Sequence, residues 1–138
     1  MATFEDVERL TATLPEGEFV HPSPDAIGDK NRRVAQVLGK GFFWERPLNK
    51  SDVKTLTALG REIPTGVIVA FRTADIDTKR ALLEMHPDVF FEIPHFEGFK
   101  GILAWLENMP EWLLVETLTE AWMSQAPPKL VREFEARG

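Results

Sequence analysis

The first fourteen positions place hydrophobic residues at helical spacing, namely Phe4, Val7, Leu10 and Leu14. Thr3 precedes this series and Asp6 follows three residues later, which is the order of a capping box at the start of a helix. Pro15 cannot continue a helix. The pattern therefore predicts an amphipathic first helix that ends before Pro15.

Apolar runs in the middle of the chain predict strands. The segment "RRVAQVLGKGFFWERP" predicts two short strands around Gly39 and Gly41. The segment "TGVIVAFR" is almost continuously apolar, which is typical of a strand that is buried on both faces or central in a sheet. "DVFFEI" and "KGILAWLE" predict another pair of strands.

Capping residues predict two helices between and after these strands. Ser51 is the expected N-cap of a short helix that stops at Gly60. Asp75 or Asp77 caps the next helix, which ends at His86-Pro87. The residues expected to point inward from this second helix are Ile76, Leu82, Leu83 and Met85.

The C-terminal third predicts the longest helix. Asn108 begins it, with Pro110 in the first turn, and its apolar face carries Leu114, Val115, Leu118 and Trp122. Pro127-Pro128 separates it from a final short helix. Strands in the middle and helices at both ends indicate one α+β domain over residues 1–138, with central antiparallel hairpins flanked by N- and C-terminal helices.

Composition is that of a soluble globular protein, with 43% hydrophobic and 28% charged residues. Cysteine is absent, which excludes disulfides, thiolate metal sites and cysteine nucleophiles. The acidic N-terminal segment has no basic and apolar regions of a signal peptide, and no apolar run approaches the ~20 residues of a membrane helix. We expect a cytoplasmic protein that does not contact a membrane.

Charge is distributed unevenly along the chain. The net charge is −6, yet residues 30–54 carry +5 and the remainder −11. A local basic face can bind a polyanion even on an acidic protein, although a basic run is equally often a solvated edge. The cations of this segment are Lys30, Arg32, Arg33, Lys40, Arg46, Lys50 and Lys54.

Aromatic residues lie within the basic segment. Phe42, Phe43 and Trp44 lie between Lys40 and Arg46, an arrangement that suits a groove for phosphates and stacked bases. The alternative is that these rings fill the core from a strand, which is the commoner role of an aromatic stripe. The remaining tryptophans, Trp105, Trp112 and Trp122, are expected to be packing residues.

His95 is the residue that bears most on catalysis. Glu92 and Glu97 lie close in sequence, but alternation along a strand would direct Glu92 and His95 to opposite faces. The expected role of the imidazole is structural, tying a hairpin corner between Pro94 and Gly98 to backbone groups. The sequence lacks zinc-ligand spacing, nucleophile elbows and phosphate loops. We therefore expect no catalytic residue, no metal and no cofactor.

The segments "DTKRALLEMHPDVFFEIPHFEGFKGILAWLE" and "LTEAWMSQAPPKLV" form a pattern over the second half of the chain. In this pattern the chain resembles the MmcQ/YjbR family of bacterial proteins. The doubled proline before Lys129 shifts that lysine by one place relative to the family pattern. The matching positions include Phe90, Phe91, Pro94, His95, Phe96, Gly98, Ala121, Trp122, Ala126, Pro127 and Lys129.

This resemblance implies a compact α+β fold whose hairpins have been likened to a double wing that binds DNA. It leads us to expect a non-enzymatic DNA-binding protein with little sequence specificity. The predicted contacts are Arg32, Arg33, Lys40, Trp44, Arg46, Lys50 and Lys54, and their cations should share one face. Two alternatives remain open: a protein-interaction or small-ligand module using the Phe90–Phe99 hairpin, and an enzyme using His95 with Glu92 or Glu97.

Overall fold

Antiparallel pairing organises the chain around a single sheet. The computed structural model describes residues 1–25, 27 and 31–137. In that part of the chain six strands pair in the order β1-β2-β3-β4-β6-β5, each antiparallel to its neighbour. The strands are β1 (Gly17–Val20), β2 (Val34–Val37), β3 (Lys40–Glu45), β4 (Ile68–Arg72), β5 (Phe90–Phe91) and β6 (Gly101–Trp105). The predicted pairs β2–β3 and β5–β6 are confirmed, and β4 is central as expected.

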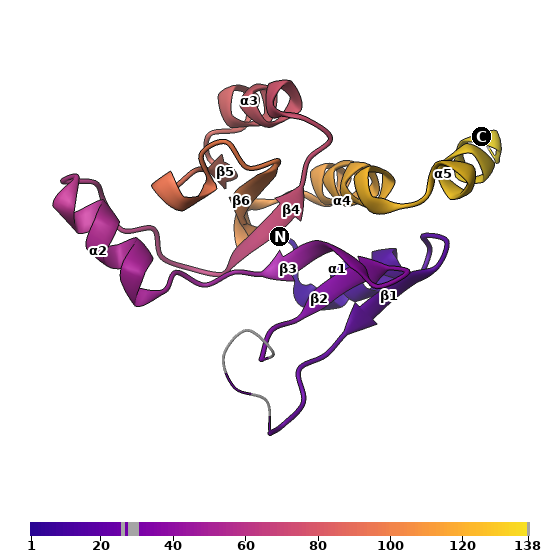
Figure 1. The fold of residues 1–138 in the computed structure, drawn as a ribbon, viewed down its shortest axis with the longest axis horizontal. Helices are drawn as coiled ribbons and strands as arrows, with labels where there is room; N and C mark the ends of the chain where they lie inside the picture. Colours follow the sequence, from indigo (N-terminus) through magenta and orange to yellow (C-terminus); the bar gives the residue numbers. More distant parts are fainter. Residues whose placement is uncertain (26, 28–30, 138) are drawn as a thin grey trace.

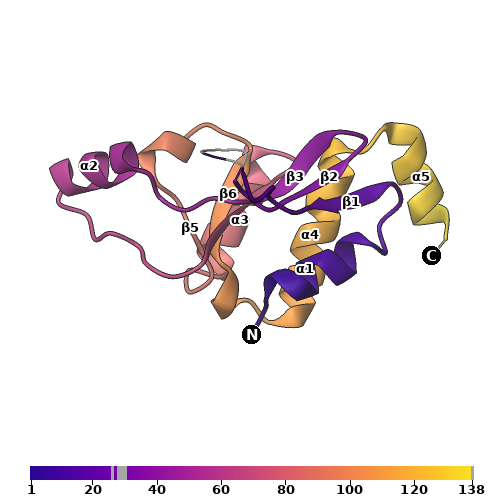
Figure 2. The same cartoon turned by 90° about the horizontal axis from the view of Figure 1, so that it is seen from below.

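The helices are placed mainly on one face and at the ends of this sheet. α2 and α5 lie at opposite ends of the long axis, while α1 and α4 lie side by side (Figures 1 and 2). The helices are α1 (Phe4–Thr11), α2 (Lys50–Ala58), α3 (Ile76–Met85), α4 (Glu111–Gln125) and α5 (Pro128–Ala136). The predicted α+β class is confirmed.

The larger core lies between the sheet and helices α1 and α4. Trp122 is fully buried there, and its indole N–H donates to the backbone oxygen of Pro15 at 2.9 Å. The register of β2 and β3 shifts between Ala35 and Gln36, which pair with Phe43 and Gly41. Strand β3 therefore carries one extra residue, Phe42, at this point. This bulge allows consecutive residues Phe42 and Phe43 both to be buried in the same core. The core alternative for these two rings is therefore correct.

A second, smaller core lies on the opposite face of the sheet. Ile68 and Ala70 of β4 pack there against Leu56 of α2, while Val69 and Phe71 face the larger core. The alternation of side chains along β4 explains the division, because both faces of a central strand are covered. Trp44 and Phe99 border this smaller core without being fully buried.

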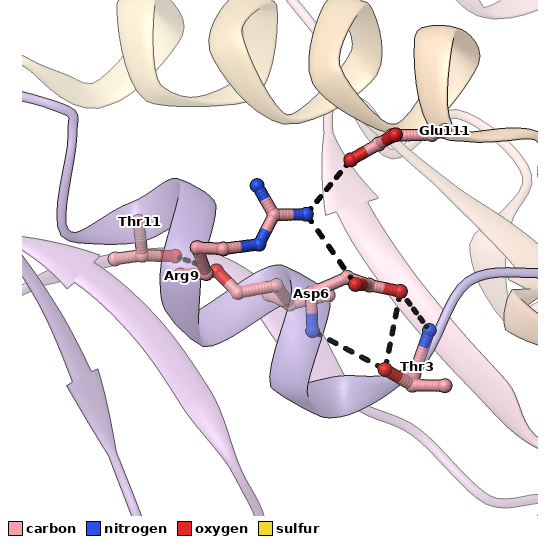
Figure 3. Close-up of polar contacts among 6 residues, drawn as sticks. Thr3, Asp6, Arg9, Thr11 and Glu111 are labelled. Atoms are coloured by element: carbon pink, nitrogen blue, oxygen red, sulfur yellow. Dashed lines mark hydrogen bonds and ion pairs between the residues drawn. The ribbon is translucent and has the colours of Figure 1, made fainter.

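The N-terminal helix is fixed by the predicted capping box and by an ion pair to α4. Asp6 N–H donates to Thr3 Oγ1, and Thr3 N–H donates back to Asp6 Oδ2 (Figure 3). Arg9 bonds Glu111 at the start of α4 at 2.8 Å. The first helix thus meets α4 through both apolar packing and a polar contact.

Several predicted details of the helices are wrong. The N-cap of α2 is Asn49, which forms a capping box with Asp52, and not Ser51. Pro110, not Asn108, is the N-cap of α4. Among the residues expected to be inside, Met85 is 68% exposed, Trp112 is 59% exposed and Val115 is also exposed. Strand β1 has no counterpart among the predicted elements.

Within the described residues, no helix is long and apolar enough to cross a membrane.

Candidate anion-binding cleft

A cleft of about 520 Å³ opens on the α2 side of the sheet. Its lining includes five side chains that come from four different segments: Arg32, Trp44, Arg46, Arg72 and His95. We call it the arginine cleft. A smaller hollow of about 280 Å³ shares Trp44, Arg46 and His95 with it, and Phe96 and Phe99 complete its lining. Three guanidinium groups, an imidazole and an indole therefore border one continuous region.

Arg72 is held against aromatic rings at the end of β4. Its guanidinium carbon lies 4.8 Å from the centroid of Phe99 and 5.8 Å from that of Trp44. Its Nε is buried without a hydrogen-bond partner, and Arg72 forms no ion pair in the described part of the chain. A guanidinium fixed by aromatic faces keeps its N–H edge available for an anion.

Arg46 is held by a buried acid. Its Nη1 lies 2.9 Å from Asp52 Oδ2 and donates to the carbonyl of Pro47 at 2.8 Å. Burial raises the pKa of Asp52, but the hydrogen bonds from Arg46 and from the amide of Asn49 outweigh it, so the pKa lies below its usual value. Asp52 is therefore ionised at neutral pH and balances the charge of Arg46.

The two consecutive arginines before β2 serve different surfaces. Arg32 lines the arginine cleft and donates to its neighbour's carbonyl oxygen. Arg33 bonds both carboxylate oxygens of Glu45 at 3.2 Å and lies 4.4 Å over the ring of Phe4, a residue of α1. Arg32 lies in a bend and Arg33 directly precedes β2, and the two side chains reach different surfaces. The expectation that the cations share one face is therefore wrong for Arg33.

The lysines of the basic segment that the structure describes, Lys40, Lys50 and Lys54, do not line the cleft. Lys40 is exposed at the start of β3, after the β2–β3 turn. Lys50 and Lys54 are exposed on α2, on the side away from the buried Asp52. Lys30 lies outside the described residues. Of the predicted contacts, the structure brings together Arg32, Trp44 and Arg46, and it adds Arg72 and His95.

The corner that carries His95 is fixed by a lysine and not by the imidazole. His95 is exposed in the 3₁₀ helix Pro94–Phe96. Lys79 of α3 is 3% exposed, and its ammonium donates to the carbonyl oxygens of Phe96 at 2.6 Å and Phe99 at 2.9 Å. Lys79 also forms an ion pair with Glu92. The predicted structural role of His95 is therefore wrong, and its ring is free to line the cleft.

The other residues of the family motif are structural or exposed. Phe90 is buried, and Phe91 stacks on Trp105 with ring centroids 4.2 Å apart. Gly98 has φ of 78°, which confirms the predicted turn. Lys129 is exposed on α5.

Two residues that shape the candidate site, Lys79 and Arg72, were missed from the sequence, although each has a local signal there. Lys79 precedes Leu82 and Leu83 by three and four positions, so helical spacing places it on the same face as these packed residues. Arg72 is the charged end of an apolar strand. Its partner rings come from distant segments, so only the fold reveals its surroundings.

Metal ligation has no geometric support in the part of the chain that the structure describes. No three His, Asp or Glu side chains there are grouped to hold an ion.

Comparison with known proteins identifies relatives over the whole domain. The chain is 40% identical over 136 residues to "Uncharacterized protein Rv2570" of Mycobacterium tuberculosis strain H37Rv, covering 99% of this chain and 98% of the relative. "Uncharacterized protein Mb2600" of Mycobacterium bovis gives the same values. The chain belongs to the family of these mycobacterial proteins. No family model matches the chain, and no solved structure matches it. The family is thus represented in bacteria, and the alignment covers 99% of this chain.

Proposed function

We propose that this protein is a non-enzymatic nucleic-acid-binding protein of low sequence specificity that engages a single-stranded segment in the arginine cleft. The observation that carries the proposal is the position of Arg72 beside Trp44, with Arg32 on the same cleft. Stacking on an aromatic ring combined with phosphate neutralisation is the usual means of binding single strands without reading sequence. The resemblance to the MmcQ/YjbR family, with its DNA-binding label, supports the same class of ligand.

A single strand suits the charges better than a duplex. Of the four arginines near the cleft, Arg33 and Arg46 each have a carboxylate partner. Arg32 and Arg72 form no ion pair among the described residues, which leaves about two cations for phosphates. A duplex footprint neutralises more phosphates than this on a broad surface. A strand of a few nucleotides needs only a narrow site.

The test is fluorescence anisotropy with a labelled oligothymidylate and a labelled duplex at 20 and 150 mM NaCl. We expect the single strand to bind more tightly, with a slope of log K against log salt of about −1.4 for two phosphate contacts. Arg72→Gln should weaken binding about tenfold, and Trp44→Leu should weaken it by a similar factor through lost stacking. Arg132→Gln on α5 is the matched control, because it removes the same charge from an exposed arginine that does not line the cleft.

Absence of single-strand binding at 20 mM NaCl would contradict the proposal. An equal loss in Arg132→Gln and Arg72→Gln would also contradict it, since the effect would then follow net charge and not the cleft.

A second candidate is a small-ligand module that binds a free nucleotide at the same cleft. The cleft volume lies within the usual range for small-molecule sites, and the charge of −11 outside residues 30–54 repels a long polyanion. Competition by thymidine monophosphate separates the two candidates. If the mononucleotide matches the oligonucleotide in affinity, the small-ligand function is favoured.

The enzymatic alternative has less support from the geometry. Its predicted partner Glu92 is engaged by buried Lys79, while His95 lies exposed on the cleft. Glu97 is also exposed beyond the 3₁₀ helix.

A further inference from the structure

The arginine cleft holds two positive charges that the described part of the protein does not neutralise. Of the described residues that line it, only Glu45 is acidic, and both the backbone N–H and the guanidinium of Arg33 donate to that carboxylate. Arg33 itself does not line the cleft. Arg46 is balanced by its buried acid partner. The guanidinium groups of Arg32 and Arg72 therefore remain without a carboxylate among the described residues.

Two free guanidinium groups on one cleft discriminate between kinds of phosphate. A phosphomonoester carries a charge of about −1.5 to −2 at neutral pH, because its second pKa is about 6, whereas a phosphodiester within a strand carries a single negative charge. Arg32 and Arg72 line the same space of about 520 Å³, which is the size of a site for one small molecule. A terminal phosphate therefore matches the free charge of the cleft better than one internal phosphate does.

The charge of the surrounding protein disfavours a strand that passes through the cleft. Residues outside 30–54 carry a net charge of −11. Close to the cleft, Glu97 is exposed two residues after His95. A strand bound at an internal position would carry phosphates over this acidic surface on both sides of the cleft, and like charges repel. A strand bound by its end does so on one side only.

An aromatic hollow adjoins the two free arginines. The hollow of about 280 Å³ shares Trp44 and His95 with the arginine cleft, and Phe99 also lines it. Trp44 and Phe99 are only partly buried. Bases stack on aromatic side chains of this kind without a sequence preference. The base next to a terminal phosphate therefore has an aromatic surface beside the cleft.

We propose that the arginine cleft recognises a terminal phosphomonoester, with Arg32 and Arg72 on the phosphate and the adjoining base in the aromatic hollow. A guanidinium directs parallel N–H donors at phosphate oxygens, which suits a group with three terminal oxygens. A phosphomonoester occurs at the 5′ end of a phosphorylated strand and on a free nucleotide. This inference rests on the proposed function or on its free-nucleotide alternative, because each places the ligand in this cleft.

The test compares three oligothymidylates by isothermal titration calorimetry with the full chain at pH 7.5 and 20 mM NaCl. The first strand has a 5′-phosphate, the second is the same strand with a 5′-hydroxyl, and the third has a 5′-hydroxyl and two more nucleotides, which give it the charge of the first. We expect the first strand to bind about tenfold more tightly than either of the others. Thymidine monophosphate and thymidine form a second pair, of which only the monophosphate should bind.

Two variants assign the contacts to the phosphate. Arg32→Gln and Arg72→Gln should each reduce the preference for the 5′-phosphorylated strand from about tenfold to about threefold or less, because each removes one charge-assisted contact. Arg132→Gln on α5 is the matched control, since Arg132 is exposed and does not line the cleft, and it should leave the preference unchanged. Thermal unfolding shows which variants are folded. Arg32 lies in a bend outside the helices and strands, so its variant tests the proposal even where Arg72→Gln fails to fold.

The outcomes separate this inference from the proposed function. If the strands bind but the phosphorylated strand and its charge-matched counterpart have equal affinity, the phosphomonoester proposal is overturned and the proposed function stands. If no strand binds while thymidine monophosphate binds and thymidine does not, the phosphomonoester proposal is supported and the single-strand function fails. An unchanged preference in the folded variants, or no binding of any phosphorylated probe, overturns the proposal.

Discussion

Replacing Lys79 by Met should destabilise the protein by about 3 kcal/mol. The ammonium of Lys79 donates to two backbone carbonyls and pairs with Glu92, and the residue is 3% exposed. Removing one partner of a buried ion pair costs about 3–5 kcal/mol, because the other charge loses its compensation. The Glu92 side chain is 28% exposed and is partly solvated, so the lower end of this range applies. Methionine preserves most of the buried stem and keeps the cavity term small.

The measurement is urea unfolding followed by tryptophan fluorescence, supported by thermal unfolding. For a chain of 138 residues, about 3 kcal/mol corresponds to a fall in Tm of roughly 10 °C. Lys54→Met is the matched control, because Lys54 is exposed on α2 and its loss should change the free energy of unfolding by less than about 0.5 kcal/mol.

A double-mutant cycle isolates the pair. Lys79→Met and Glu92→Gln together should cost at least about 1 kcal/mol less than the sum of the single changes, because contacting residues are not independent. The reasoning is refuted if Lys79→Met behaves like the Lys54→Met control, or if the two effects add within experimental error.

Three further outcomes are expected. Trp122→Phe should cost about 2 kcal/mol in urea unfolding, because it leaves the carbonyl of Pro15 unpaired and opens space in the core, whereas Trp112→Phe at the exposed position should cost little. The pKa of Asp52 is lowered in the folded protein, so its ionised form stabilises the fold at neutral pH, and this contribution is lost as the pH falls below about 4. Asp52→Asn should therefore make Tm depend less on pH in the acid range. A Tm-against-pH profile as steep as that of the original protein would contradict this expectation. Gly17→Ala should destabilise by about 2 kcal/mol because its Cβ would lie 2.4 Å from the carbonyl oxygen of Thr11. Gly41→Ala should cost measurably less in the same assay, because its Cβ would meet only the side chain of Val34, at 3.4 Å.

The fold was largely predictable from local patterns. The capping box at Thr3, the strands on either side of Gly39 and the buried run in β4 each express a preference that is contained in neighbouring residues. The errors in helix capping arose where neighbouring residues were equally good candidates. Asn49 and Ser51 are both good N-caps near one another, and only the bond between Asn49 and the amide of Asp52 selects the first.

The burial or exposure of individual helix side chains was less predictable. Met85 and Trp112 have apolar side chains at helical spacing, yet the sheet covers only part of each helix surface. Lys79 shows the reverse case. A lysine is rarely buried without partners, and those partners are carbonyl oxygens seventeen and twenty residues away together with Glu92.

By itself the sequence determined the α+β class, the order of the central strands along the chain and the presence of a basic, aromatic segment, because these follow from periodicity and composition. Only the tertiary structure decided which cations meet. Arg32, in a bend, and Arg33, beside β2, reach different surfaces, and Asp52 and Glu45 balance two of the arginines. Antiparallel pairing brings Arg72 to Trp44 from a strand more than twenty residues later. Charge along a chain is local information, whereas the position of charge in space depends on pairing between distant segments.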